Sequence, residues 1–268
     1  MYHNVTPDDH AYPDLSPSAT SYFVTRRTFA EQLAQIRVCG GSVMTWDDLK
    51  QFYDPAPPAA PRPADSPVFI TFDDGWRDSV EIGGSTLQEH GCSAIVFVTT
   101  GFLDRPHFLS RQELARLDAD VFRVGSHAKT HRMLSLLDDT EIRAELSDSR
   151  KCLEDATGRE VDAISIPSGA VDRRVRRIAA ECGYRFLFDS EVRVNRRGDS
   201  PMAIARVALM NTTPLSTFRR YVTQRITRER VRRAVLQAPK RLLGLRRYER
   251  LRRRLLGEQR GQRVTHES

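Results

Sequence analysis

Two adjacent carboxylates, Asp73 and Asp74, follow an apolar segment at 68–72 and are themselves followed by Gly75. The segment is rich in β-branched and aromatic residues, which predicts a buried parallel strand. Sites in α/β folds are built at the carboxyl ends of strands, and the glycine allows a sharp turn that points the two carboxylates in different directions. One could hold a metal ion while the other moves a proton. An isolated Asp-Asp-Gly, however, is more often an Asx turn that closes a strand.

Two histidines, His127 and His131, follow a second apolar segment at 121–124. Their i, i+4 spacing would place both imidazoles on one face of a single helical turn. Two histidines and one carboxylate leave coordination positions open, which is the pattern of a catalytic metal site. A lone His-x3-His is more often a pair of surface histidines, so this prediction depends on the Asp-Asp-Gly segment lying nearby.

Three short motifs together resemble one known family. TFDDG at 71–75 and SHAKTH at 126–131 are similar to the first two motifs of the polysaccharide deacetylases, the NodB-homology carbohydrate esterases of family 4. ISIPSG at 164–169 resembles the third motif in its F-A-Y-P-Y-G variant, and Gly183-Tyr184 follows at the usual interval. The resemblance extends from about Met1 to Val207.

The resemblance implies a metal-dependent hydrolase that removes N-acetyl groups from amino sugars of a glycan or glycan precursor and releases acetate. It makes Asp74, His127 and His131 the metal ligands and Asp73 the general base. The backbone N–H of Ser168 would hold the oxyanion. Zinc (Zn²⁺) is the expected metal, with Co²⁺, Ni²⁺ or Mn²⁺ as alternatives.

Two further roles follow from the branch of the family whose motif is an amino-terminal Tyr-His. His3 would protonate the leaving amine, since no later Leu-x-His motif is present. Arg206 resembles the arginine that orients the catalytic aspartate in this branch, while Ser165 stands where other branches carry that arginine. The strand that normally ends in Tyr-His is almost missing, so we expect it to fray or the true start to lie upstream.

Two other functions remain open. The chain could be a catalytically silent sugar-binding relative, because Ser168 stands where the family usually has tyrosine and Ser165 replaces an arginine; the four motif carboxylates and histidines argue against this. It could also hydrolyse an amide that is not a sugar, since related barrels host such amidohydrolases.

The segments that must position these residues alternate between strand and helix patterns. We expect strands at 42–45, 68–72, 94–98, 121–126, 163–166, 185–188 and 203–210, and helices at 27–38, 46–53, 111–117, 139–156 and 171–182, with another ending at His90. Repeated units of this length imply an α/β fold with a parallel sheet. The resemblance adds that the sheet closes into an irregular (β/α) barrel.

Length and charge divide the chain into a catalytic domain at 1–225 and a basic tail at 226–268. The chain has 268 residues and a net charge of +7, but from residue 219 onward it carries 17 Arg or Lys against 4 Glu. Apolar and arginine positions at 228–256 predict a basic amphipathic helix, which suits an anionic membrane surface. Nucleic acid is a less favoured partner, because no aromatic stacking platform accompanies the arginines. A tail helix packed on the barrel is the other alternative.

Localisation and redox state follow from two simple patterns. The sequence contains no apolar run of membrane-spanning length and no basic region followed by an apolar core at its start, so we expect a cytoplasmic protein, peripheral at the inner face of the membrane. Cys39, Cys92, Cys152 and Cys182 are scattered along the chain, which predicts reduced thiols.

Overall fold

The structure is a computed structural model that describes residues 1–54 and 66–231. The chain divides into two compact units, Met1–Arg225 and Ile226–Ser268. Only 226–231 of the second unit are described, so the amphipathic helix expected at 228–256 lies almost entirely outside the described residues.

A curled parallel sheet forms the centre of the first unit. Its strands run in the order β5 (Thr71–Phe72), β6 (Ala94–Val98), β7 (Phe122–Ser126), β8 (Ala163–Ser165) and β9 (Phe186–Phe188). Every residue of β6 is buried, because both faces of the sheet are covered. Two smaller parallel pairs accompany it, β1 (Asn4–Thr6) with β2 (Phe23–Thr25) and β3 (Gly41–Val43) with β4 (Ser66–Val68).

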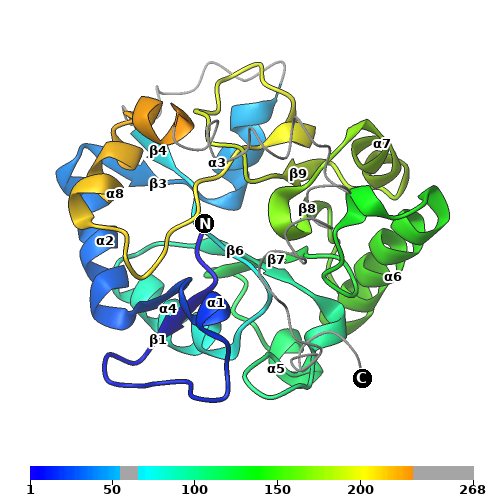
Figure 1. The fold of residues 1–268 in the computed structure, drawn as a ribbon, viewed down its shortest axis with the longest axis horizontal. Helices are drawn as coiled ribbons and strands as arrows, with labels where there is room; N and C mark the ends of the chain where they lie inside the picture. Colours follow the sequence, from blue (N-terminus) through cyan, green and yellow to red (C-terminus); the bar gives the residue numbers. More distant parts are fainter. Residues whose placement is uncertain (55–65, 232–268) are drawn as a thin grey trace, which may run out of the picture. The chain divides into compact units, whose positions relative to one another are not determined.

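Helices surround these strands, as Figure 1 shows. They are α1 (Pro17–Thr20), α2 (Arg26–Val38), α3 (Trp46–Tyr53), α4 (Arg77–Glu89), α5 (Arg111–Ala115), α6 (Asp139–Thr157), α7 (Arg173–Glu181) and α8 (Leu215–Val222), with short 3₁₀ turns η1 (Thr100–Phe102), η2 (Leu134–Leu136), η3 (Pro167–Gly169) and η4 (Pro201–Ala203). The longest, α6, begins with a capping box between Asp138 and Glu141 and ends at Gly158 with a φ of 64°. The predicted alternation of strands and helices is therefore confirmed.

Two irregular segments close the curled sheet into a barrel. Tyr2 forms a parallel bridge with Phe72 at one edge, and Ile204 forms one with Phe188 at the other edge. Between the bridges, the N–H of Leu209 donates to the carbonyl of Met1 at 3.0 Å. The expected irregular (β/α) barrel is thus present, and its closure depends on segments that are not strands.

Two predicted strands are wrong. The segment 68–72 is split, because Val68 belongs to β4 beside β3 while Thr71 begins β5 beside β6. The segment 203–210 is not a strand beyond the bridge at Ile204. Its backbone at Ala205 bonds instead to the side chain of Asn195, which donates to the carbonyl at 2.9 Å and accepts from the N–H at 2.9 Å. A side-chain amide here replaces a neighbouring strand.

The expectation of a frayed amino-terminal segment is also wrong. The N–H of Tyr2 donates to the carbonyl of Thr71 at 2.8 Å, and its carbonyl accepts from the N–H of Asp73 at 3.0 Å. The Tyr2 hydroxyl donates to Gln32 Oε1 at 2.8 Å, and the residue is only 3% exposed. Tyr2 anchors the segment, because its backbone pairs with the chain at Thr71 and Asp73 and its aromatic ring is buried.

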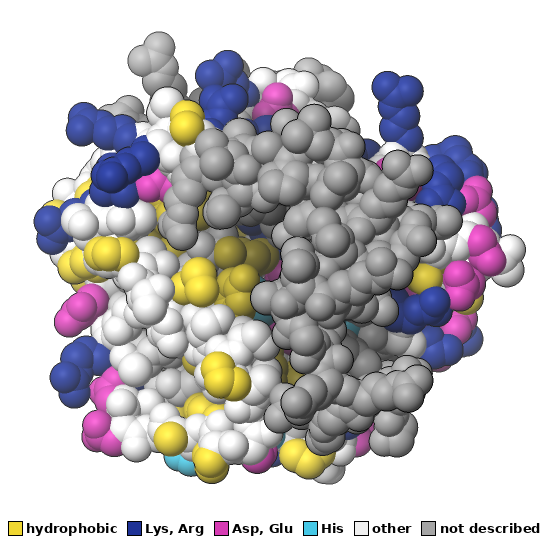
Figure 2. Space-filling view, in the orientation of Figure 1, with side chains coloured by type: hydrophobic (Ala, Val, Ile, Leu, Met, Phe, Trp, Pro, Cys, Tyr) yellow, Lys and Arg dark blue, Asp and Glu magenta, His cyan; other side chains and the backbone are white. Residues whose placement is uncertain are grey.

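The described surface mixes charges of both signs. Figure 2 shows Lys and Arg side chains interspersed with Asp and Glu around the edge of the visible face, and hydrophobic side chains nearer its centre. Many of these charges form exposed ion pairs, such as Arg143 with Glu181 and Arg177 with Asp139. Among the described helices, none is long and apolar enough to cross a membrane. The four cysteines are free, as predicted.

Candidate active site

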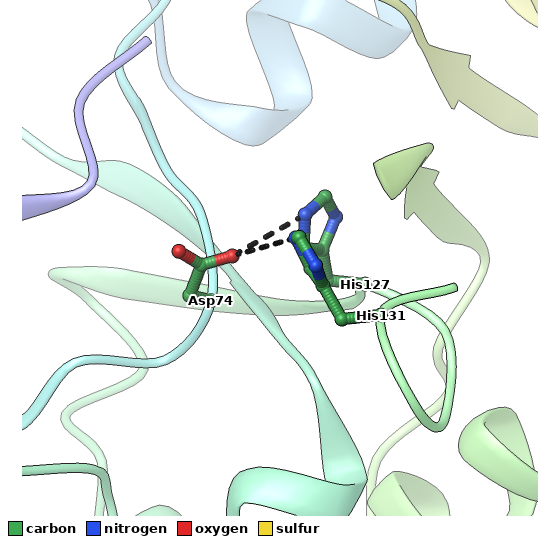
Figure 3. Close-up of side chains that lie close together, drawn as sticks. All are labelled: Asp74, His127 and His131. Atoms are coloured by element: carbon green, nitrogen blue, oxygen red, sulfur yellow. Dashed lines mark ion pairs between the residues drawn. The ribbon is translucent and has the colours of Figure 1, made fainter. Parts of the chain in front are cut away.

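Asp73 and Asp74 lie at the turn that follows β5. Asp74 has a φ of 76° and Gly75 a φ of 86°, so two successive residues are left-handed. This conformation is strained for an aspartate and turns the chain within two residues. As a result, the Asp73 side chain lies against Arg206, whereas the Asp74 side chain faces His127 and His131 (Figure 3).

Asp74, His127 and His131 form a compact cluster of three potential metal ligands. Asp74 Oδ1 lies 3.4 Å from His127 Nε2 and 3.3 Å from His131 Nε2 (Figure 3). The other carboxylate oxygen, Oδ2, accepts a hydrogen bond from Trp76 Nε1 at 3.1 Å. Oδ1 itself is buried and has no hydrogen-bond partner among the described residues. A buried carboxylate oxygen that faces two imidazole nitrogens without a regular hydrogen bond is suited to a bound cation.

The protonation state of His127 also favours a bound cation. Its Nδ1 lies 2.8 Å from the carbonyl oxygen of Ser165, which can only accept, so Nδ1 must carry the proton. Burial lowers the pKa of His127 to about 4, and the ring is therefore neutral near pH 7. Nε2 then directs a lone pair toward Asp74 Oδ1. Two acceptors facing each other at 3.4 Å fit a bound cation, and the three residues accordingly fit a divalent metal.

His131 reaches the cluster by a route that the sequence did not predict. Residues 127–131 are not helical, and both Ala128 and His131 have a positive φ, of 61° and 60°. The i, i+4 spacing places the imidazoles together because the loop bends twice, not because it completes a helical turn. Burial would lower the pKa of His131, but the carboxylate of Asp74 raises it above the ordinary value.

Asp73 is enclosed by hydrogen-bond donors. Arg206 Nη1 donates to its Oδ1 at 2.7 Å and Nη2 to its Oδ2 at 2.9 Å, a bidentate pair. The Ser165 hydroxyl donates to Oδ2 at 3.1 Å and accepts from Arg206 Nη2 at 2.6 Å. Arg206 also donates to the hydroxyl of Thr71 and is only 7% exposed. Ser165 and Arg206 therefore act as one unit around the carboxylate.

These contacts determine the protonation of the two aspartates. Burial would raise the pKa of Asp73, but the charge of Arg206, with that of His127, lowers it to about 2. Burial acts the same way on Asp74, and the neighbouring histidines hold its pKa far below the ordinary range. Both carboxylates are ionised at neutral pH, so Asp73 is available as a proton acceptor.

His3 follows Tyr2 in the amino-terminal segment, and Ser168 lies in the 3₁₀ turn after β8. The His3 ring packs on Tyr22 with centroids 4.5 Å apart, and its Nδ1 is buried without a hydrogen-bond partner among the described residues. Its charge contributes to the lowered pKa of both Asp73 and Asp74. Ser168 is exposed within η3 at the end of β8, with a φ of 60°.

Sequence reasoning missed Trp76 and misjudged Ser165. Trp76 directly follows the DDG motif and donates to Asp74, a contact that its position in TFDDGW could have suggested. The motif comparison identifies Ser165 only by the arginine that it replaces, yet its carbonyl orients His127 and its hydroxyl contacts Asp73.

Comparison with known proteins agrees with the motifs. The family model described as Polysaccharide deacetylase matches residues 60–187. YxkH of Bacillus subtilis (strain 168), whose name describes a polysaccharide deacetylase, is 24% identical over 161 residues, covering 60% of this chain and 58% of that protein. Chitin deacetylase 1 of Cryptococcus neoformans var. grubii is 30% identical over 115 residues, covering 42% of this chain and 23% of that protein. The chain thus spans less than two thirds of both curated relatives.

Solved structures share the fold. The deacetylase PplD of Streptococcus pyogenes, in complex with acetate, has a TM-score of 0.70 at 19% identity, covering 83% of this chain and 96% of that one. IcaB from Ammonifex degensii has a TM-score of 0.69 at 22% identity, with coverage of 82% and 94%. The family match includes Asp73 and all three residues of the cluster, whereas His3 and Arg206 lie outside it. Residues 60–187 of the chain thus match the polysaccharide deacetylase family.

Proposed function

We propose that this chain is a metal-dependent hydrolase that removes N-acetyl groups from the amino sugars of a glycan or glycan precursor and releases acetate. One observation carries the proposal: the buried, unpartnered Oδ1 of Asp74 lies within 3.4 Å of Nε2 atoms from two histidines. That donor set suits zinc, with cobalt, nickel or manganese as alternatives.

The residues around the cluster supply the remaining chemistry. A bound divalent cation lowers the pKa of water and polarises the acyl carbonyl. Asp73, ionised and held in place by Arg206 and Ser165, accepts the proton of the attacking water. The backbone N–H of Ser168 donates to the developing oxyanion. His3 protonates the departing amine, which would otherwise be too poor a leaving group.

Two other functions are distinguished from this one by specific features. A silent sugar-binding relative is disfavoured by the ionised, arginine-paired Asp73, because binding alone needs no buried base. Hydrolysis of a non-sugar amide uses the same site and differs only in substrate. The choice between sugar and non-sugar amide is therefore a matter for a substrate screen.

A metal analysis and an acetate-release assay test the proposal. We expect about one equivalent of a divalent metal per chain, and acetate from N-acetylhexosamine oligomers only when metal is present. Acetate from simple amides but from no sugar would favour the non-sugar amidohydrolase. Metal binding without turnover on any amide would favour the silent relative.

We also propose that the basic residues after 225 attract the protein to an anionic surface, peripheral to the inner face of the cytoplasmic membrane. The support is charge alone: 17 Arg or Lys against 4 Glu from residue 219 onward. A lipid-linked or nucleotide-activated sugar would be a suitable substrate in that location.

A further inference from the structure

The loop at 127–131 needs partners for its backbone, because it is not a helix. In a helix, each backbone N–H donates to the carbonyl oxygen of the residue four positions earlier, and this loop lacks those hydrogen bonds. Its left-handed residues Ala128 and His131 are not glycines, so this backbone conformation is strained. Something outside the loop must therefore hold it in the conformation that brings His131 to Asp74.

Glu145 provides acceptors for this loop. Its Oε2 accepts the backbone N–H of Lys129 at 2.9 Å and that of Thr130 at 2.8 Å. Its Oε1 accepts a hydrogen bond from the Thr130 hydroxyl. Glu145 is only 6% exposed and lies on the inner face of α6, among Ile142, Leu146 and Ser149. A carboxylate in an apolar stripe is costly unless it is well hydrogen-bonded, and the loop donors meet that need.

The opposite side of the loop is held by η1. The N–H of Thr100 donates to the carbonyl of Ala128 at 3.2 Å, and that of Gly101 donates to the carbonyl of Lys129 at 2.8 Å. A Cβ at Gly101 would lie 2.6 Å from the Lys129 carbonyl oxygen, so only glycine allows this approach. The loop is thus clamped between η1, which donates, and Glu145, which accepts.

We propose that Glu145 is a positioning residue that presets His131 for metal binding. Its hydrogen bonds go to the loop and not to the cluster, and it acts by holding the backbone N–H groups of Lys129 and Thr130. The proposal rests on the metal site of the proposed function and adds that the second histidine is oriented before metal arrives. Because preorganisation lowers the cost of binding, its loss should appear in metal affinity.

The test measures cobalt affinity and the visible spectrum of bound cobalt in the full chain, after its native metal has been removed. Three variants separate reach from charge: E145A removes all acceptors, E145D keeps the charge but withdraws it by one methylene, and E145Q keeps an acceptor oxygen without charge. D148A is the matched control, since Asp148 also lies on α6 and contacts the loop only through the exposed Lys129 Nζ at 2.8 Å.

We expect dissociation constants about 10–100-fold higher in E145A, intermediate in E145D, and within a few-fold of the original in E145Q and D148A. The backbone amides of 129 and 130 should exchange faster in E145A and E145D. If E145A does not fold, the contrast between E145D and E145Q decides. Unchanged affinity in folded E145A, or E145D tighter than E145Q, would overturn the positioning role. No cobalt binding by the unaltered chain would overturn the proposed metal site together with this inference.

Discussion

Asp73 and Asp74 are neighbours in the chain, yet they have different charged partners. Asp73 is paired with the guanidinium of Arg206, while one oxygen of Asp74 faces only imidazole nitrogens. The left-handed turn at Asp74 and Gly75 separates the two side chains. One carboxylate is therefore fully hydrogen-bonded, and the other has an oxygen available for a ligand.

Substitution of a metal ligand and substitution of the base should therefore have different effects. H127A or H131A should lose metal and with it turnover, because an open three-ligand site needs all its ligands. D73N should retain metal and lose activity, by about 10²-fold or more, because the amide cannot accept the proton. Metal content and kcat measured on the same preparations check both. A fully active D73N would show that Asp73 is not the base.

His3 should behave as a group that acts late in the reaction. H3A is expected to keep metal and fold and to lower kcat by about 10²–10⁴-fold, the usual range for a lost general acid. Y22F is the matched control, since it preserves the ring that packs on His3. The measurement is kcat for an acetamido substrate and for an ester, whose better leaving group needs less protonation. Equal losses on both substrates would argue against an acid role.

At the scale of elements, the site depends on helices that approach the sheet closely. Gly83 and Gly84 are buried in the interior of α4, where glycine normally lowers helix stability. A Cβ at Gly84 would lie 2.8 Å from Cε2 of Phe122, a buried ring on β7. The glycine is thus required by packing rather than by backbone conformation.

Alanine at position 84 should therefore destabilise the protein although alanine favours helices. We expect G84A to lower the free energy of unfolding by about 1–3 kcal/mol through overpacking. S85A, on the exposed side of the same helix, should change it by no more than about 0.5 kcal/mol. Urea unfolding of both variants makes the comparison. A stabilised G84A would mean that Phe122 moves aside at little cost.

At the scale of the whole molecule, folding stability should depend on alkaline pH through Tyr184. Burial raises the pKa of Tyr184 to about 12, and its hydroxyl donates to the carbonyl of Leu146 at 3.0 Å. Between pH 10 and pH 12 the unfolded chain loses the proton first, so stability falls as pH rises through that window. From pH 8 to pH 11, the unaltered chain should lose about 1.4 kcal/mol more than Y184F, as measured by urea unfolding. An equal loss in both would exclude Tyr184 as the source.

The basic tail gives the second prediction at this scale. A chain ending at residue 231 should remain folded and active but bind anionic vesicles more weakly than the full chain, with a difference that disappears at high salt. Vesicle sedimentation at two salt concentrations measures this, with neutral vesicles as the control. Equal binding by both chains would reject a membrane role, and insolubility of the shorter chain would favour a tail helix that packs on the barrel.

Local sequence patterns predict much of this fold. Apolar runs, caps such as Asp138 with Glu141, and the terminating Gly158 predict most strands and helices, because their energies depend on residues a few positions apart. The three motifs likewise identify Asp73, Asp74, His127 and His131 as the chemically important residues. These features require no knowledge of which segments meet in space.

Other features were decided only by tertiary structure. Asp73 and Arg206 are 133 residues apart, and the barrel joins them by closing through Tyr2 and Ile204. The loop at 127–131 is not the helical turn that the His127–His131 spacing predicts, because Glu145 and Gly101 form hydrogen bonds with its backbone from two sides. The split of 68–72 into two strands has the same origin, since each half pairs with a different neighbour. Local patterns rank the conformations of a segment, but contacts between distant residues choose among them.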